Sequence, residues 1–196
     1  MVLGGVVLAL LAGAVLPVVR SKLKTGSSGV TIHQPARKRR LLGTLLGALG
    51  ASPLLWGLAC AIWGPTTVGV WEHPAWVDAL GAVLFLGGIG LVVLSQATMG
   101  KAWRIGIDAA PTSLVTAGPF GWVRNPIYDG MMLMSLGLVA ATPALWTLFG
   151  TVAYATLIQV QVRQEERHLV ELHGAPYQAY LARVGRFIPG LGRVGA

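Results

Sequence analysis

The side chains best suited to chemistry gather in residues 118–130 and, further along the chain, in the pair Glu165 and Glu166. Residues 118–130 combine glycines and prolines with an arginine, an asparagine, an aspartate and aromatic rings. A Gly-Pro turn followed by an Asn-Pro step keeps the residue before each proline out of the α region and leaves backbone groups free of a helix. Such a loop can wrap a polar ligand. The alternative is a connecting loop whose Trp122 and Arg124 only mark a membrane surface.

The composition defines the class of protein that carries this loop. Hydrophobic residues make up 54% of the 196 residues, charged residues only 11%, and the mean hydropathy is +0.66. These values lie outside the range of soluble globular domains and predict an integral membrane protein. The single cysteine, Cys60, lies in an apolar segment, and no two of the four histidines form an i,i+4 pair. We therefore expect no metal site.

Five apolar runs predict an all-α protein with five transmembrane helices. The runs cover residues 1–19, 41–63, 75–95, 127–141 and 144–162. We expect the first run to be retained rather than cleaved as a signal peptide. A tight turn at Thr142 and Pro143 makes the fourth and fifth helices antiparallel neighbours. The fifth run continues without a helix breaker to Gly174, and a helix of about thirty residues is about 45 Å long, so its last turns stand outside a hydrocarbon core of about 30 Å.

The third apolar run is rich in glycine, with Gly81, Gly87, Gly88 and Gly90. Small residues on a membrane helix let a neighbouring helix approach closely. The spacing Gly88-x-Gly90 could indicate a nucleotide-binding loop, but no strand precedes it, so we favour helix packing.

The positive charges predict the orientation of these helices. Taken loop by loop, Lys and Arg number seven, none, three, none and five, so all 15 lie on one side of the membrane. The positive-inside rule then places the N-terminus outside and residues 20–40, 96–126 and 163–196 in the cytosol. The net charge of +8 is explained by this topology and by contact with anionic membrane lipids, without nucleic acid.

The third loop and the protruding end of the fifth helix lie on the same predicted side, so their polar residues can converge where water meets lipid. On a helix, Glu165 shares a face with Gln161 and His168, whereas Glu166 points about 100° away, toward the side of Arg163. The alternative for this pair is a solvated helix end that does no chemistry.

These residues carry a resemblance to a known family. The motifs are Leu114-Val115-Thr116-x-Gly118-Pro119-Phe120-x-x-Val123-Arg124-Asn125-Pro126-x-Tyr128-x-Gly130, Glu165-Glu166, Gly174-x-x-Tyr177-x-x-Tyr180 and Arg186-x-Ile188-Pro189. In this order they resemble the isoprenylcysteine carboxyl methyltransferase and phospholipid methyltransferase family. The resemblance covers residues 95–191. It implies a catalytic region at 95–196, with membrane helices four and five and cytosolic C-terminal helices, after an N-terminal part at 1–94 with helices one to three.

The resemblance implies a membrane enzyme that binds S-adenosylmethionine at the cytosolic face and takes a lipophilic acceptor, such as a prenylated substrate, from the bilayer. The implied cofactor-binding residues are Gly118, Pro119, Phe120, Val123, Arg124, Asn125, Pro126, Tyr128, Glu165 and Glu166. The expected catalytic residues are Arg124, Glu165 and Arg163. The expected substrate-binding residues are Trp103, Arg104, Tyr128 and Arg167. In this arrangement, an arginine such as Arg163 would orient an acceptor carboxylate.

The acceptor is the open part of this interpretation. The ends of the motif block resemble the isoprenylcysteine branch and favour O-methylation of a carboxylate, whereas Asn125 and Asp129 resemble the phospholipid N-methyltransferase branch and leave an amine as the alternative. A further alternative is a membrane reductase of the steroid-reductase type that uses NADPH, and another is a non-catalytic scaffold. The Gly-, Ala-, Val- and Leu-rich sequence indicates a bacterial cytoplasmic membrane, and the oligomeric state stays open.

Overall fold

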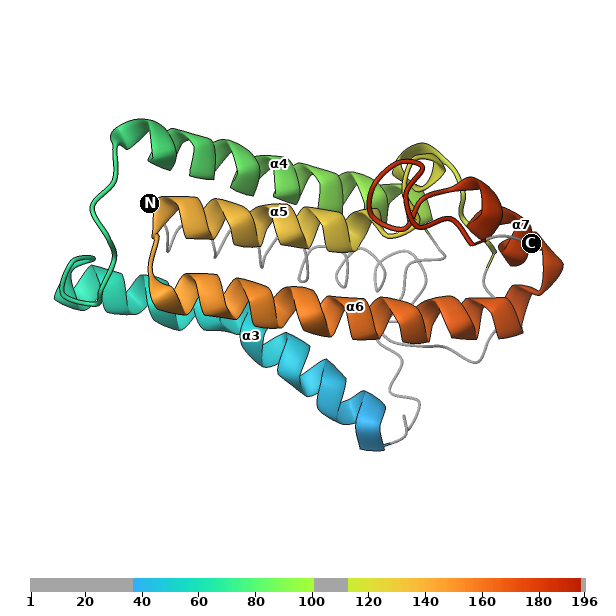
Figure 1. Cartoon of the computed structure of the whole chain (residues 1–196), viewed down its shortest axis with the longest axis horizontal. Helices are drawn as coiled ribbons and strands as arrows, with labels where there is room; N and C mark the ends of the chain where they lie inside the picture. Colours follow the sequence, from blue (N-terminus) through green and yellow to red (C-terminus); the bar gives the residue numbers. More distant parts are fainter. Residues whose placement is uncertain (1–36, 101–112, 195–196) are drawn as a thin grey trace.

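The computed structural model describes residues 37–100 and 113–194, and the regular elements in these ranges are all helical. They are the α-helices α3 (Arg37–Trp63), α4 (Ala75–Met99), α5 (Pro126–Ala141), α6 (Leu145–His173) and α7 (Ala175–Arg183), with a 3-10 helix, η3 (Gly118–Gly121), before α5. Helices α4, α5 and α6 run roughly along one direction, and α7 lies at one end of them (Figure 1). The predicted first membrane helix, at residues 1–19, lies outside the described residues.

The helix ends fall at the breakers that the sequence provides. Helix α3 ends before Gly64, which has a φ of +85°. Helix α5 begins at Pro126, whose fixed φ and missing N–H suit the first helical position. Helix α6 is one helix of 29 residues that ends before Gly174, where φ is +58°. The predicted bounds are confirmed to within a few residues, and α4 continues to Met99 rather than ending near Ser95.

Helices α4 and α5 touch backbone to backbone through two pairs of glycines. A Cβ atom on Gly88 would lie 2.5 Å from the carbonyl oxygen of Gly130, and one on Gly137 would lie 2.6 Å from that of Gly81. No side chain larger than hydrogen fits at these separations. Because Gly81 faces Gly137 while Gly88 faces Gly130, the two helices are antiparallel. The predicted close helix contact is therefore confirmed at Gly81 and Gly88.

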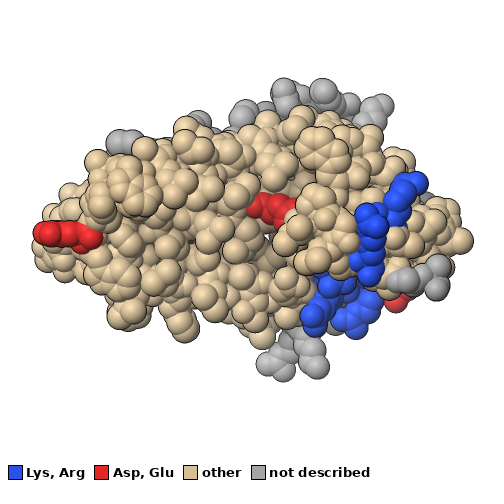
Figure 2. All heavy atoms as spheres, turned by 45° about the horizontal axis from the view of Figure 1, so that its top comes forward, with Lys and Arg blue, Asp and Glu red and all other residues tan. Residues whose placement is uncertain are grey.

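Two connections meet at the end of the molecule opposite α7 (Figure 1). The backbone N–H of Trp71, between α3 and α4, donates to the carbonyl oxygen of Pro143, between α5 and α6, at 2.8 Å. Trp56 Nε1 also donates to Thr142 Oγ1 at 3.3 Å. These are the two connections that carry no Lys or Arg. The visible Lys and Arg side chains form a band near one end of the molecule (Figure 2), as the charge pattern predicts.

Helices α3, α4 and α6 are long and apolar enough to cross a membrane, and α5 is a shorter apolar helix. Large apolar side chains stay exposed on their surfaces, including Leu55 on α3 and Phe149 on α6, each with 73% of its surface accessible. An exposed apolar surface of this kind is costly in water and suits contact with lipid. The helices and their surfaces therefore agree with a membrane protein.

Candidate functional site

The loop before α5 folds onto the end of α4. Gly118 has a φ of +58°, and a Cβ atom there would lie 3.2 Å from Thr98 Oγ1, so glycine allows both the turn and the close approach. Pro119 and Phe120 are buried in the turn η3. The hydroxyl of Tyr180 in α7 donates to the carbonyl oxygen of Phe120 at 2.6 Å. Burial raises the pKa of Tyr180 to about 12, so this phenol stays a neutral donor near pH 7.

Arg124, at the end of this loop, has a fully buried side chain that joins four segments. Its Nε donates to Glu166 Oε1 on α6 at 3.0 Å. One terminal nitrogen donates to the carbonyl oxygens of Leu181 and Val184 at the end of α7. The other donates to the carbonyl oxygen of Gly192 at 3.0 Å. A guanidinium group has five N–H donors, so these contacts leave one for any other partner.

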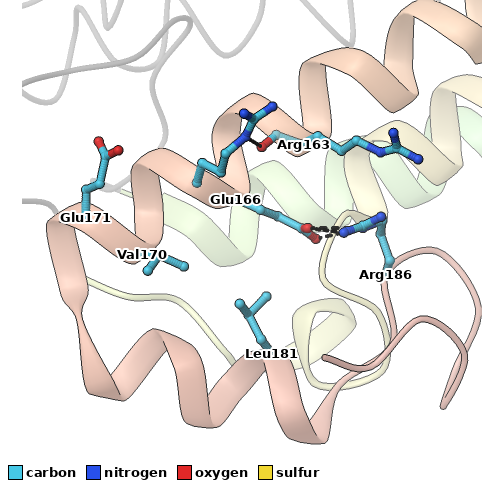
Figure 3. A pocket seen from close by; sticks show the side chains of 7 residues that line it. Arg163, Glu166, Val170, Glu171, Leu181 and Arg186 are labelled. Atoms are coloured by element: carbon cyan, nitrogen blue, oxygen red, sulfur yellow. Dashed lines mark hydrogen bonds and ion pairs between the residues drawn. The ribbon is translucent and has the colours of Figure 1, made fainter. Parts of the chain in front are cut away.

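Glu166 is the anion at the centre of this cluster, with a side chain only 8% exposed. Arg186 donates to both of its oxygens, and the shortest contact joins Arg186 Nη2 to Glu166 Oε2 at 2.6 Å (Figure 3). Asn125 Nδ2 adds a longer contact of 3.4 Å to Oε1. A carboxylate that accepts hydrogen bonds from two guanidinium groups is neutralised and saturated. Its arrangement indicates a structural role.

The segment after α7 passes close to the loop before α5. The N–H of Arg124 donates to the carbonyl oxygen of Gly185 at 2.8 Å, and Val123 and Gly185 form an isolated parallel β-bridge. A Cβ atom on Gly185 would lie 2.0 Å from the carbonyl oxygen of Ile188, a separation that no side chain tolerates. Glycine at this position therefore allows the tight path that brings Arg186 to Glu166.

Glu165 has different neighbours from Glu166 although it is adjacent in sequence. Its Oε1 accepts a hydrogen bond from Tyr128 on α5 and another from Gln161 on α6, each at 2.7 Å. Both donors are neutral, and among the described residues no cation forms an ion pair with Glu165. Its Oε2 accepts no hydrogen bond from a described residue. As far as the described residues show, Glu165 is therefore an oriented acceptor with capacity for a further donor.

The predicted site residues divide into those that the structure brings together and those that lie elsewhere. The contacts above join Arg124, Asn125 and Tyr128 to the glutamate pair, and the predicted shared face of Glu165 and Gln161 is confirmed. The alternative of a solvated helix end is wrong for Glu166, which is 6% exposed. The predicted residues that line the core of the loop are buried: Pro119, Phe120, Val123 and Pro126. Trp103 and Arg104 lie outside the described residues.

A cleft of about 450 Å³ lies between α6 and α7 (Figure 3). Its lining residues are Arg163, Glu166, Arg167, Val170, Glu171, Leu181 and Arg186. Arg163 and Arg167 are exposed, and neither forms an ion pair with a described residue. Arg167 Nε instead donates to the carbonyl oxygen of Arg163 at 3.1 Å. The cleft thus offers two guanidinium groups that form no ion pair with a carboxylate of the described residues.

The prediction of site residues missed Arg186 and Gln161. Arg186 lies in the last motif of the resemblance. Because a buried carboxylate requires a cationic partner, the basic C-terminal segment was a signal that could have identified it. Gln161 lies one helical turn before Glu165, and this i,i+4 spacing places an amide donor beside the carboxyl group.

Comparison with known proteins found a matching family model and several similar proteins. Residues 76–176, just over half of the chain, match the family model described as phospholipid methyltransferase. The chain is 34% identical over 119 residues to the cobalt-zinc-cadmium resistance protein CzcN of Cupriavidus metallidurans, a match that covers 59% of this chain and 52% of the relative. It is 30% identical over 122 residues to the nickel-cobalt-cadmium resistance protein NccN of Alcaligenes xylosoxydans xylosoxydans, covering 61% and 56%. It is 28% identical over 154 residues to the methanethiol S-methyltransferase of Pseudomonas sp. (strain GM41(2012)), covering 71% and 57%. The chain spans a little over half the length of these relatives.

We predict that Glu166→Gln destabilises the fold and that Glu165→Gln does not. Removal of the buried negative charge leaves Arg124 and Arg186 without their counter-ion, at a cost of about 3 kcal/mol. For a chain of this size, the apparent Tm should fall by roughly 6–12 °C. Thermal unfolding in detergent, followed by tryptophan fluorescence at one scan rate, measures the difference. Glu171→Gln is the control, because the Glu171 side chain is 77% exposed. An equal Tm for Glu166→Gln and this control would contradict a structural role for the cluster.

Proposed function

Because the chain belongs to the phospholipid methyltransferase family, we propose that it transfers a methyl group from S-adenosylmethionine to a lipophilic acceptor at the cytosolic face of a membrane. The observation that carries the proposal is that the two adjacent glutamates have different hydrogen-bond partners. Glu166 is neutralised by two arginines, whereas Glu165 is oriented by Tyr128 and Gln161 and has no cationic partner among the described residues. A methyl donor with an ammonium group and ribose hydroxyls needs such an acceptor.

The residues around Glu165 suit the other groups of this cofactor. S-adenosylmethionine carries an ammonium, a carboxylate and a sulfonium, and it supplies the methyl group to be transferred. Glu165 Oε2 can accept from the ammonium or a ribose hydroxyl, and the ring of Tyr128 can lie against a cation. The backbone N–H group of Gly118 or Asn125, neither of which donates to a described acceptor, can donate to the carboxylate. Arg124 then acts mainly as a positioning residue that holds the loop against α6 and α7.

The cleft between α6 and α7 supports a carboxylate as the acceptor. Near pH 7 a carboxylate is already ionised, so it needs a cation to orient it and no base. Arg163 and Arg167 present guanidinium groups of this kind. The carboxylate oxygen forms the new bond to the methyl carbon while the bond from sulfur to that carbon breaks and its electron pair stays on sulfur. An isoprenylcysteine is an acceptor with such a carboxylate and a tail soluble in the bilayer.

Two other acceptors have support of their own. A phospholipid amine fits the name of the matching family model, and it must lose a proton, for which Asp129 in the first turn of α5 is a candidate. A thiol fits the similarity to methanethiol S-methyltransferases. The matches to methyltransferases favour methyl transfer over an NADPH-dependent reductase.

The membrane topology is also part of the proposal. We infer five transmembrane helices, with residues 1–19 and α5 added to the three long apolar helices, and with the basic end in the cytosol of a bacterial cell. Single cysteines at Thr67 and at Gln178, both exposed, test the orientation in a Cys60→Ser background. In intact cells, an impermeant maleimide should label the cysteine at position 67 and spare that at 178. Equal labelling of both would refute this topology.

We predict that Glu165→Gln weakens binding of S-adenosylhomocysteine while the protein stays folded. Loss of a charge-assisted hydrogen bond is worth roughly 2 kcal/mol, or about thirtyfold in Kd. Isothermal titration of the purified protein measures this change, with Glu171→Gln as a control that should bind normally. Unchanged affinity in Glu165→Gln would remove Glu165 from the site. Binding of NADPH, without binding of S-adenosylhomocysteine, would favour the reductase.

The acceptor is tested by rates of methyl transfer to a prenylcysteine analogue, phosphatidylethanolamine and methanethiol between pH 6 and pH 9. We expect turnover of the prenylcysteine with little dependence on pH, because a carboxylate needs no deprotonation. We also expect a KM at least about tenfold higher in Arg163→Gln/Arg167→Gln, with little change in S-adenosylhomocysteine binding. Transfer to the amine or thiol that rises with pH and survives this double substitution would overturn the carboxylate. Loss of amine transfer in Asp129→Asn would identify its base.

A further inference from the structure

Four large apolar side chains are exposed on the loop before α5 and on the segment after α7. These two parts of the chain carry Arg124 and Arg186, the ion-pair partners of Glu166. Trp122 has 75% of its surface accessible, Leu191 65%, Ile188 58% and Val194 45%. None of them lies on a helix that could cross a membrane. Exposed apolar groups gathered on loops mark a contact surface. We call Trp122, Ile188, Leu191 and Val194 the apolar tip.

Backbone contacts hold the two parts of the apolar tip together. The loop of Trp122 is joined to the C-terminal segment by the bridge between Val123 and Gly185 and by the hydrogen bond from Arg124 N to Gly185 O. Within the C-terminal segment, Leu191 N donates to Ile188 O at 3.0 Å and Arg186 N donates to Leu191 O at 2.9 Å. The tip is therefore a fixed feature beside the site and not a pair of independent loops.

The helix geometry sets the depth of this tip. The loop of Trp122 packs on the last turn of α4, where Gly118 meets Thr98. Trp76, 66% exposed, lies in the first turn of the same helix. From Trp76 to Thr98 an α-helix rises about 33 Å, close to the hydrocarbon thickness of about 30 Å. If Trp76 lies at the outer interface, where tryptophan is enriched, the loop of Trp122 lies at the inner one.

The charges beside the tip agree with this depth. Arg183 and Arg193 are exposed on the same C-terminal part of the chain, and neither forms an ion pair with a described residue. Arginine at the cytosolic surface is attracted to anionic lipids, while tryptophan, isoleucine and leucine favour the boundary between headgroups and acyl chains. Another apolar side chain near the end of α4, Leu94, is 55% exposed.

We propose that the apolar tip is seated in the cytosolic leaflet of the membrane, at the boundary between lipid headgroups and acyl chains. The occupant of this surface is the lipid bilayer itself. The segment that covers Arg124 and Glu166 then rests on the membrane surface. The proposal rests on the membrane assignment and not on the identity of the reaction.

Spin labels test directly whether the apolar tip lies in the lipid bilayer. Single cysteines at Leu191 and Ile188, in a Cys60→Ser background, carry a nitroxide in protein reconstituted at one molecule per lipid nanodisc. Gln178→Cys, on the exposed face of α7, is the matched control. Collision rates with oxygen, which concentrates in lipid, and with a water-soluble nickel chelate are measured for each label. We expect an oxygen-to-nickel ratio several-fold higher at positions 188 and 191 than at 178.

Two other outcomes would overturn the proposal. A ratio at 188 and 191 equal to that at 178 would place the tip in water. Shielding of both labels from oxygen and nickel alike would mean that protein covers the tip. Binding of S-adenosylhomocysteine by the same labelled samples shows that they are folded, and either overturning result could be obtained with that binding intact. Conversely, a seated tip in a protein that binds no S-adenosylhomocysteine would refute the proposed function alone.

Discussion

The buried cluster of Arg124, Glu166 and Arg186 is the interaction on which the rest of the site depends. Burial of two guanidinium groups and one carboxylate removes all three charges from water, which costs free energy. This cost is offset because each charge is paired and because Arg124 also donates to three backbone carbonyl oxygens. The partners of Glu166 lie 42 and 20 residues away in sequence, so this one carboxylate joins the loop before α5 to the segment after α7. The same contacts tie α6 to both segments, and on the same helix Glu165 accepts a hydrogen bond from Tyr128 of α5.

Adjacent positions on a helix let the glutamate pair divide two tasks. Side chains one residue apart point about 100° from each other, so Glu166 can face α7 while Glu165 faces α5. Glu166 is saturated by cations, whereas Glu165 accepts only one contact each from a phenol and an amide. A carboxyl group already paired with two arginines has little left to offer a ligand. Rigidity supplied by Glu166 therefore leaves Glu165 available as an oriented acceptor.

Much of the fold follows from the sequence because its signals are local. The apolar runs predicted the helices, Gly174 predicted the end of α6, and the distribution of basic residues among the loops predicted which helix ends lie together. The sequence did not predict which face of α4 packs against α5. Gly81 and Gly88 face α5, whereas a Cβ atom on Gly87 or Gly90 would meet nothing within 4 Å. For the site, spacing alone predicted that Gln161 shares a face with Glu165. Local spacing favoured Arg163 as the neighbour of Glu166, and the ion pair with Arg186 was missed because it depends on the tight path at Gly185.

The burial of these charges also separates the parts of the site that can vary from those that cannot. Substitution in the cluster around Glu166 leaves a buried ion without its partner. The resulting loss in the free energy of unfolding is several times larger than that caused by most surface substitutions. Arg163 and Arg167 are exposed, so their replacement costs the fold little. If they contact the acceptor, as proposed, the acceptor can change while the cofactor side is held constant. Such an arrangement is compatible with one fold that serves amine, thiol and carboxylate acceptors, because the methyl donor is the same and the acceptors differ in how the nucleophile is held and in whether it must first lose a proton.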